Sequence, residues 1–596
     1  MTSKFKNYSA FRVILHFFRQ AKVEFFIVLF LTILNAAYLF LFKYTPSLDG
    51  AQHLYNSNVI GQILKGNDFI RSFFEINEVP VGYWTAHTLL SSFNLILPAW
   101  LSDKLFLLIY LIATPMLFRY MIRSFNSRAL YTTILILPVV YNGYYFMGYY
   151  AFIIAWPIVL LLLGYFFRHI KSMQTKHWLV LGLLFLLAFL SHMIVFTFTL
   201  AVVFGWLVFD QVFTLIKTRK IHLKPGITKI FKTLLALLPA LVLAVMYVRH
   251  VFTLNKGTSL GEVVSKPFSE LWQTFTNLSI LVGFTHEKEG PWNVFFFWVM
   301  ASLLLIALVY AIVQKHRNTP ESDDKQRYVY FWGLISLVIL VFYFVFPNTF
   351  GTGNVSNRIL VFFLFSCVTF LAIQNYPKWI HILIVVSVIV YSVGMYNVRK
   401  LPFEKQNQLI ADFMQTQDLM EPNSSYITLR CHEMWNNVHY GCYAGAEKPL
   451  VCLNSPQNVG HFPVVWNYDE APRSYLGVNS PSDIEINWFP GSDEGSIRPI
   501  DYVVVYGHYN FLNNEKYSDL KQKTLTFYEL VGKTEKNHGA VYKFSLKDYI
   551  QKQTKFINSH QEWPEKIKEK AQKRGISLED MYYVDIMYMH LQTQNH

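Results

Sequence analysis

Long apolar segments recur through the first two thirds of the chain, and Lys and Arg collect in every second gap between them. A helix needs about 20 apolar residues to cross a bilayer, so these segments predict about eleven membrane-spanning helices. The spans are expected over residues 23–43, 103–122, 129–142, 145–167, 178–192, 194–214, 231–249, 292–313, 329–346, 358–374 and 379–396. The third and fifth are short, so we expect these helices to stop partway and to border a cavity.

The placement of basic residues orients the predicted bundle. Loops rich in Lys and Arg face the cytoplasm, so the N-terminus and every second loop are expected on that side. The basic residues are Lys4, Lys6, Arg12, Arg19, Lys22, Arg119, Arg123, Arg128, Arg168, Lys171 and Lys176, with the loops 217–232 and 315–327. The outer side then holds the loop 44–102, the loop 250–290 and everything after the last span.

Composition agrees with an integral membrane protein, since 53% of residues are hydrophobic, 17% aromatic and only 15% charged. The net charge of +14 is assigned to cytoplasmic loops and the tail, where it contacts anionic headgroups, so nucleic acid is not an expected partner. The first apolar run is long enough to span and lacks a small-residue cleavage site, which predicts a signal anchor. A bacterial inner membrane is the expected location.

After residue 396 the sequence becomes polar and predicts a soluble outer domain at 397–546 and a helical tail at 547–596. SSYITLR and IDYVVVYG are short β-branched runs, and FYELVGKTEKNHGAVYKF alternates around a turn like a β-hairpin. These strands predict that the outer domain has an α/β or α+β fold. In the tail, Pro564 opens a charged helix, Gly575 ends it, and Ser577 caps the next one.

The outer loop 44–102 carries the densest candidate chemistry. Asp49 follows the first span, where a carboxylate can act as general base on a lipid-borne substrate; the alternative is a helix cap. His53 lies four residues later, on the same helical face, as an orienting partner or a metal ligand, or as a plain surface contact. Glu75, Glu78 and His87 are further substrate-binding candidates in this loop, with ordinary solvated or hydrogen-bonded roles as the alternative.

Arg358 begins a late span, after the outer turn GTGNVSNR. A guanidinium binds phosphate oxygens in a bidentate manner, so Arg358 is a candidate for a lipid phosphate; the alternative is snorkelling to headgroups. Arg249, beside His250 at the end of another span, is a weaker phosphate candidate. Aromatic residues gather in YNGYYFMGYY, VGYWTAH and GPWNVFFFW, either to stack on sugars or as an interfacial belt.

Cysteines and buried polar residues are few. Cys367 lies in a span, while Cys431, Cys442 and Cys452 in the outer domain allow at most one disulfide. His432, His439 and His461 stand nearby, but their spacing with the cysteines matches no zinc motif. His192 and Asp210 lie within the apolar segments, and each is expected to face the bundle interior because polar groups are costly in lipid.

Together these features resemble the GT-C superfamily of integral membrane glycosyltransferases over residues 1–396. The resemblance rests on YTPSLDG after the first span, the long outer loop, NGYYFMGYYAF, LSHMIVF, Arg358 and the C-terminal outer domain. It implies a polyprenyl-phosphate-linked sugar donor and makes Asp49 the base or metal-linked activator. The family often has paired acids here, whereas Gly50 and Ala51 follow Asp49. A divalent metal therefore stays open as a cofactor, and no metal ligand is assigned.

The leading hypothesis is an inverting sugar transfer to an extracytoplasmic glycan, lipid or protein. Asp49 would act as base, His53 would orient it, and Arg358 would hold phosphate. Membrane lipids are the other expected partners. Two alternatives remain: a lipid or glycan flippase or transporter, and a non-catalytic membrane assembly protein. His192 and Asp210 are isolated polar groups within the spans, which weakens the hypothesis of a proton-coupled transporter. An acyltransferase would need a histidine base buried in the membrane, and only His192 could serve as one.

Overall fold

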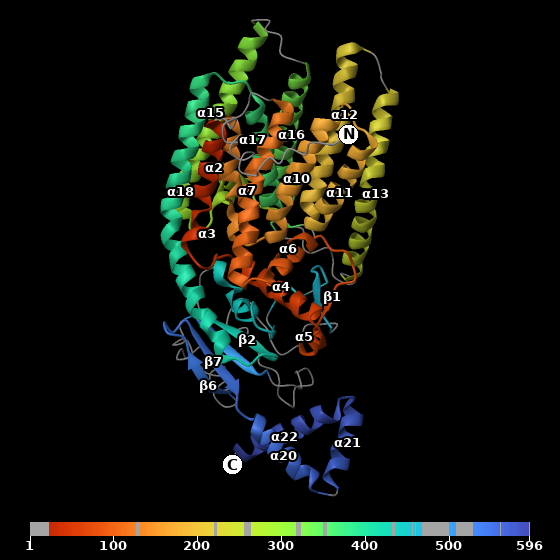
Figure 1. Cartoon of the computed structure of the whole chain (residues 1–596), viewed down its shortest axis with the longest axis vertical. Helices are drawn as coiled ribbons and strands as arrows, with labels where there is room; N and C mark the ends of the chain where they lie inside the picture. The colour runs from red at the N-terminus through yellow and green to blue at the C-terminus, as the bar shows by residue number, and fades with distance from the viewer. Residues whose placement is uncertain are drawn as a thin grey trace, which may run out of the picture.

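The structure is a computed structural model in which a helical bundle stands on a smaller domain that contains a β-sheet (Figure 1). It describes residues 23–126, 131–219, 223–254, 264–316, 323–349, 354–431, 435–453, 455, 457–458, 460–467, 500–507, 528–560 and 562–594. The basic residues before 23, Arg128 and His432 lie outside these ranges, so the expectations that rest on them lie outside the described residues.

Eight helices in the described ranges are long and apolar enough to cross a membrane. They are α7 (Ala99–Phe125), α10 (Tyr150–His169), α12 (Met193–Thr218), α13 (Leu223–Leu254), α15 (His286–His316), α16 (Asp323–Val345), α17 (Val355–Ile373) and α18 (Lys378–Phe413). Shorter apolar helices cover the other three predicted segments: α2 (Val23–Asn35) with α3 (Ala37–Leu41), η1 (Tyr131–Ile136) with α8 (Leu137–Val140), and α11 (Thr175–Ser191). The protein is thus a polytopic helical membrane protein, and the expected short third and fifth segments are short in the structure.

Loops that the charge pattern assigns to one side gather at one end of the bundle, the far end, opposite the β-sheet domain. There, Lys171 pairs with Asp324, the Arg327 guanidinium lies 2.5 Å from Asp210, and the Arg119 guanidinium lies 2.7 Å from buried Glu24. These contacts join segments that are distant in sequence. Asp210, expected to face the bundle interior, is paired with Arg327 near this end.

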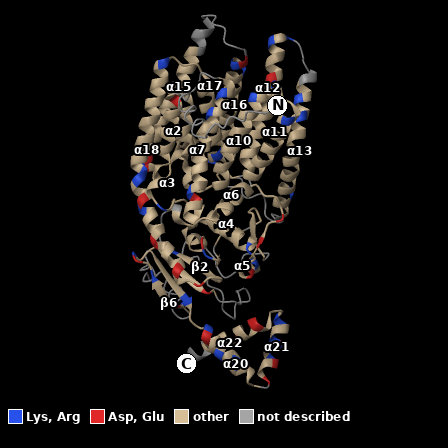
Figure 2. Cartoon of the chain, viewed as in Figure 1, with Lys and Arg blue, Asp and Glu red and all other residues tan. Residues whose placement is uncertain are grey.

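Charged residues are sparse along the sides of the bundle and gather at its two ends and over the β-sheet domain (Figure 2). On α13, for example, Leu235 is 60% exposed and Val242 50%. Exposure of such a band of Leu, Val and Phe to water would be unfavourable, and soluble proteins rarely expose large contiguous apolar patches. The band therefore faces lipid.

Between the first and second segments lie three short helices, α4 (Gly50–Leu64), α5 (Asp68–Phe73) and α6 (Trp84–Asn94), and strand β1 (Phe74–Ile76). They form a layer between the bundle and the β-sheet domain (Figure 1). This end is called the domain end. Strand β1 pairs antiparallel with β4 (Val464–Trp466), which places Glu75 opposite Val465. Loop and domain are thus joined by backbone hydrogen bonds.

The C-terminal domain contains a five-stranded mixed sheet with the order β3-β2-β5-β7-β6. The predicted strands are present as β2 (Ser424–Cys431) and β5 (Tyr502–Gly507), which run parallel, and as the hairpin β6 (Tyr528–Lys533) and β7 (Gly539–Phe544). Strand β3 (Leu450–Cys452) pairs parallel with β2. Three 3-10 turns accompany them: η3 (Met414–Leu419), η4 (Trp435–Asn437) and η5 (Tyr440–Gly445).

The last span does not end at the predicted residue 396, because α18 continues to Phe413 and carries the chain directly into the sheet domain. The tail consists of α20 (Lys547–Asn558), α21 (Trp563–Arg574) and α22 (Leu578–Gln594), which share a small apolar core of their own. Gly575 ends α21 in a left-handed conformation, and Ser577 Oγ accepts from the Asp580 N–H, as the sequence pattern predicts.

Candidate functional site

Asp49 lies at the domain end of the bundle, at the N-cap position of α4, but its side chain makes no capping hydrogen bond. The start of α4 is instead held by the backbone of the turn between α9 (Gly143–Phe146) and α10. Leu48 N–H donates to Phe146 O at 3.2 Å, and Asp49 N–H donates to Met147 O at 2.9 Å. Because a cap needs the side chain on its own helix, the capping alternative fails and the carboxylate is available for other contacts.

The close approach of α4 to this turn requires two glycines. Gly148 has φ +69°, and a Cβ on it would lie 2.5 Å from Gly50 N and 3.1 Å from Asp49 N. A Cβ on Gly50 would lie 2.1 Å from Ser47 Oγ. Any larger residue at either position would push Asp49 away from the bundle.

The turn is itself fixed by a buried ion pair. Arg399 Nε on α18 lies 2.8 Å from Glu289 Oε2 on α15, and both side chains are 1% exposed. Arg399 also donates to Tyr141 O at 3.2 Å and to Leu281 O at 2.6 Å. Glu289 accepts from the backbone N–H groups of 283, 284 and 285. The pair is thus fully hydrogen-bonded, as a buried pair must be to persist, and it ties three segments together behind Asp49.

The carboxylate of Asp49 faces the C-terminal domain. Its Oδ1 lies 3.6 Å from Nε2 of His439, which immediately precedes η5. Burial raises the pKa of Asp49 to about 7. Burial, helped by the positive charge of Arg430, lowers the pKa of His439 to about 4. Near neutral pH the imidazole is therefore neutral and the carboxyl group is about half ionised, which suits a base that takes up a proton at that pH.

His53, the predicted partner of Asp49, faces the other way. Its Nδ1 lies 3.3 Å from Nε2 of His87 on α6, and its ring stacks on Tyr150 with centroids 5.1 Å apart. Since Nδ1 of His87 contacts the Tyr83 carbonyl at 3.0 Å, that nitrogen carries the proton, and Nε2 then accepts from His53. Burial lowers the pKa of both histidines, that of His87 to about 4. The two rings thus form a neutral buried pair behind Asp49.

Arg358 lies in the first turn of α17 and is 8% exposed. Its guanidinium carbon lies 5.9 Å from the ring centre of Tyr149. Burial raises the pKa of Tyr149, the Asp49 carboxylate raises it further, and the Arg358 guanidinium lowers it. Burial also raises the pKa of Tyr83, the Arg358 guanidinium lowers it, and the Asp49 carboxylate raises it. Asp49 and Arg358 therefore share one environment, lined by two phenols, and a buried Arg358 does not fit the snorkelling alternative.

Two amide side chains continue the polar surface along α4. Gln52 and Asn56 follow Asp49 at helical spacings that keep them near one face, and they are 1% and 0% exposed. Asn56 accepts from Asn458 Nδ2 at 2.8 Å, while neither amide atom of Gln52 hydrogen-bonds to a described residue. Buried amides in proteins are nearly always hydrogen-bonded. Gln52 therefore offers both a donor and an acceptor to a polar ligand.

Three other predicted residues lie apart from Asp49 in the structure. Glu75 on β1 and Glu78 just after it are exposed, and Arg249 is exposed near the end of α13. His250, beside Arg249, contacts the Gly460 carbonyl at 3.0 Å.

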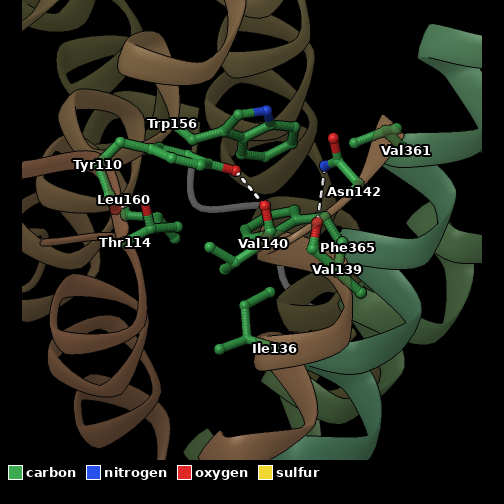
Figure 3. A pocket seen from close by; sticks show the side chains of 10 residues that line it. All are labelled: Tyr110, Thr114, Ile136, Val139, Val140, Asn142, Trp156, Leu160, Val361 and Phe365. Atoms are coloured by element: carbon green, nitrogen blue, oxygen red, sulfur yellow. Dashed lines mark hydrogen bonds between the residues drawn. The ribbon is translucent and has the colours of Figure 1, made fainter. Parts of the chain in front are cut away.

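A narrow, mostly apolar cavity lies inside the bundle, where the short third segment ends (Figure 3). Tyr110 and Asn142 border it: Tyr110 donates to Val140 O at 2.6 Å, and Asn142 donates to Val139 O at 2.7 Å. These side chains satisfy carbonyls that the broken helix leaves open, which is what allows a helix to end inside a membrane. The cavity expected from the short segment is therefore present.

His192 is buried at the junction of α11 and α12, and its ring meets Phe152 and Tyr83 with centroids 5.3 and 5.8 Å away. It faces the interior, as expected. Among the described residues there is no group of three His, Cys, Asp or Glu that could hold a metal ion. His439, considered in the sequence beside the cysteines, contacts Asp49 instead.

Several site residues had weak or no sequence signal. Tyr83 and Tyr149 belong to aromatic clusters that the sequence singles out, without distinguishing them from an interfacial belt. Gln52 carries no signal beyond its place on the face of Asp49. His439 carries none, because its link to Asp49 exists only once the C-terminal domain folds against the first loop.

No known protein-family model matches the chain. No curated protein matches it in sequence. Among solved structures, it is similar to ArnT from Cupriavidus metallidurans bound to undecaprenyl phosphate, with 11% identity and a TM-score of 0.45 over 87% of this chain and 97% of that one. The apo state of the same protein gives 11% identity and a TM-score of 0.47 over the same shares.

Proposed function

We propose that this protein is a membrane glycosyltransferase of the GT-C type that takes a sugar from a polyprenyl-phosphate donor. The observation that carries the proposal is the shared environment of Asp49 and Arg358. A half-buried carboxyl with a pKa of about 7 and a buried guanidinium both act on Tyr83 and Tyr149 at the membrane boundary. The phosphate of a lipid-linked sugar donor reaches this depth from the membrane. The acceptor of the sugar arrives from the side of the C-terminal domain.

The proposed reaction is a single displacement. The Asp49 carboxylate takes the proton of an acceptor hydroxyl or amine, and that atom bonds to the anomeric carbon of the sugar. The bond from this carbon to the phosphate oxygen breaks, and its electron pair stays on the phosphate. Arg358 stabilises the charge that develops there, which is the largest electrostatic demand of such a step. Attack opposite the leaving group inverts the anomeric centre.

The surrounding residues have supporting roles in this proposal. Neutral His439, whose Nε2 lies 3.6 Å from the Asp49 carboxylate, presents its polar ring edge to that group and orients it. Gln52 and Asn56 hydrogen-bond to sugar hydroxyls, which need several donors and acceptors at fixed positions. The His53–His87 pair sets the surface on which α4 and α6 pack. Glu75, Glu78 and Arg249 remain candidates for the outer rim, and a divalent metal remains open.

The proposed orientation follows from the charge pattern. The far end, with Lys171, Arg119 and Arg327, faces the cytoplasm, and the C-terminal domain faces the outside of a bacterial inner membrane. The acceptor is then an extracytoplasmic glycan, lipid or protein. The division of the chain into a membrane part, an outer domain and a helical tail is part of the same proposal.

The test is transfer of radiolabelled sugar from synthetic polyprenyl-phosphate donors by the purified protein, with a membrane extract as source of acceptor. We expect transfer by the wild-type protein and a loss of about 10²- to 10⁴-fold in Asp49→Asn. Asp68→Asn removes an exposed acid from the same loop and serves as the matched control, with activity unchanged.

Two results contradict the proposal. Undiminished turnover in Asp49→Asn removes Asp49 from the mechanism. A wild-type protein that consumes no polyprenyl-phosphate sugar is not this enzyme, and the transporter and assembly alternatives then take precedence. A transporter would keep its activity in Asp49→Asn and lose it on substitution of His192.

A further inference from the structure

Three cysteines follow the last span, and the structure distinguishes between them. Cys442 lies in η5 and Cys452 ends β3, and their sulfur atoms are 3.8 Å apart. This is close to the contact distance of two sulfurs, whereas a disulfide measures about 2.05 Å. The two sulfurs are therefore close enough to make this pair the candidate for a disulfide.

The backbone register excludes the third cysteine as a partner of Cys452. Cys452 pairs with Tyr426 across the β3–β2 ladder, while Cys431 lies at the other end of β2, opposite Gly507. From Tyr426 to Cys431 the strand rises about 16 Å. Disulfides need Cα atoms within about 7 Å, so Cys431 and Cys452 cannot be bridged in this fold.

The pair of thiols is enclosed. Cys442 is 3% exposed and Cys452 is 0% exposed. Helix α4 covers them: the backbone N–H of Cys452 donates to Tyr55 Oη at 2.8 Å. Oxidants in solution reach the sulfurs only before α4 docks, and reductants are excluded afterwards.

We propose that Cys442 and Cys452 form a structural disulfide during folding, in the extracytoplasmic orientation given under the proposed function. The oxidant is a disulfide-carrying thiol oxidoreductase of that compartment. The two cysteine sulfurs form one S–S bond, and the disulfide of the oxidoreductase breaks. Its two sulfurs receive the two electrons and the two protons.

The bond has a consequence for the candidate site. η5 begins directly after His439, the residue that contacts Asp49. Tyr426 Oη also donates to Gly441 O at 3.1 Å, so η5 is held to β2 by a hydrogen bond and to β3 by the disulfide. The S–S bond thus fixes the segment that presents His439 to the first loop.

The test uses the full-length protein, exported to the membrane of cells with an oxidising outer compartment and purified in detergent without reductant. Denaturation in N-ethylmaleimide, digestion and mass spectrometry then assign each thiol. We expect a linked Cys442–Cys452 peptide pair and alkylation of only Cys367 and Cys431 among the four cysteines. Dithiothreitol should reduce the bond in denatured protein and leave it intact in folded protein.

A wild-type protein alkylated at all four cysteines overturns the inference, as does any linkage through Cys431. Cys367→Ser is the matched control and should keep the linked pair, while Cys442→Ser should expose Cys452 to alkylation on denaturation. A separate variant, Ser559→Cys on the exposed end of α20, reports orientation through labelling of intact cells by an impermeant maleimide. Labelled Ser559→Cys with no linked pair contradicts the disulfide alone, and failure to label contradicts the orientation as well.

Discussion

Nε2 of His439 lies 3.6 Å from Oδ1 of Asp49, and this contact joins the first loop of the bundle to the C-terminal domain. The two residues are 390 positions apart in the sequence, one in the first loop and one in the C-terminal domain. The proposed base therefore has its final environment only when the domain is packed against α4. A domain that lies after the last span is in this way part of the site.

The rate of sugar transfer should fall on the acid side of neutrality. Burial raises the pKa of Asp49 to about 7, and only the carboxylate can accept a proton. We expect kcat to drop about tenfold per pH unit below pH 6 and to level off above pH 8. Steady-state rates between pH 5 and 9 give this profile; a limb near pH 4 would mean that Asp49 is not the titrating base.

His439 should affect the pH at which the rate of sugar transfer falls on the acid side. A neutral imidazole N–H that faces a carboxylate stabilises its ionised form. His439→Leu keeps the site dry and removes the donor, so we expect the acid limb to move to higher pH, with a smaller effect on donor KM. His461→Leu, on a nearby loop, is the comparison that should leave the profile in place. An unchanged limb in His439→Leu would show that the 3.6 Å contact has no electrostatic role.

Asp49 should also affect stability with a defined sign. Its pKa is raised in the folded protein, so its favourable contribution is complete below the unfolded value near 4 and is lost as pH rises through 7. Asp49→Asn removes the charge that burial penalises. We expect the variant to match wild type in Tm near pH 4, to exceed it progressively between pH 4 and 7, and to exceed it fully at pH 8.5. A variant that melts lower at pH 8.5 would contradict a buried, destabilised carboxylate.

Arg358 should act on the donor phosphate. Hydrogen bonds to charged groups contribute about 1.5–3 kcal/mol, so Arg358→Ala should lower kcat/KM by about 10- to 100-fold. Arg358→Lys keeps the charge without the bidentate geometry and should recover only part of this loss. Arg249→Ala on the exposed end of α13 is the comparison and should change less. The reverse ranking would move the phosphate to Arg249.

The buried pair of Arg399 and Glu289 should be the most sensitive point of the bundle. Removal of one partner leaves an uncompensated buried charge, which costs about 3–5 kcal/mol of unfolding free energy. Arg399→Met and Glu289→Gln should each lower Tm, and the double variant should lower it by less than the sum. Additive losses would show that the two side chains do not depend on one another, despite the 2.8 Å contact.

Gly148 should matter for the position of α4 as well as for stability. Gly148→Ala incurs about 1–2 kcal/mol for its left-handed backbone and also pushes α4 away. Gly66→Ala has the same backbone penalty, with φ +79°, but its Cβ meets nothing nearer than 4.0 Å. Gly148→Ala should therefore lose more stability than Gly66→Ala, because its Cβ also meets the backbone of Asp49 and Gly50, and only Gly148→Ala should lose activity. Equal activities in the two would remove the requirement for close docking of α4.

Local sequence determined the elements of this protein. Apolar runs of sufficient length became helices, the short third and fifth segments stayed short, and the β-branched runs SSYITLR and IDYVVVYG became β2 and β5. The described basic residues Arg119, Lys171 and Arg327, which the charge pattern assigns to one side, lie at the same end of the bundle. Asp49 and Arg358 were recognisable as candidates because an acid and an arginine at membrane boundaries stand out against apolar neighbours.

The tertiary structure alone decided which candidates meet. Sequence spacing paired His53 with Asp49, but His53 packs on His87 and Tyr150, and His439 from the distant C-terminal domain takes its place. The tertiary structure likewise decided three other features: the continuation of α18 into the sheet domain, the pairing of β1 with β4, and the approach of Cys442 to Cys452. Helix and strand formation depend on neighbours along the chain, whereas these contacts form between segments hundreds of residues apart. Their energy comes from packing and burial that no local pattern records.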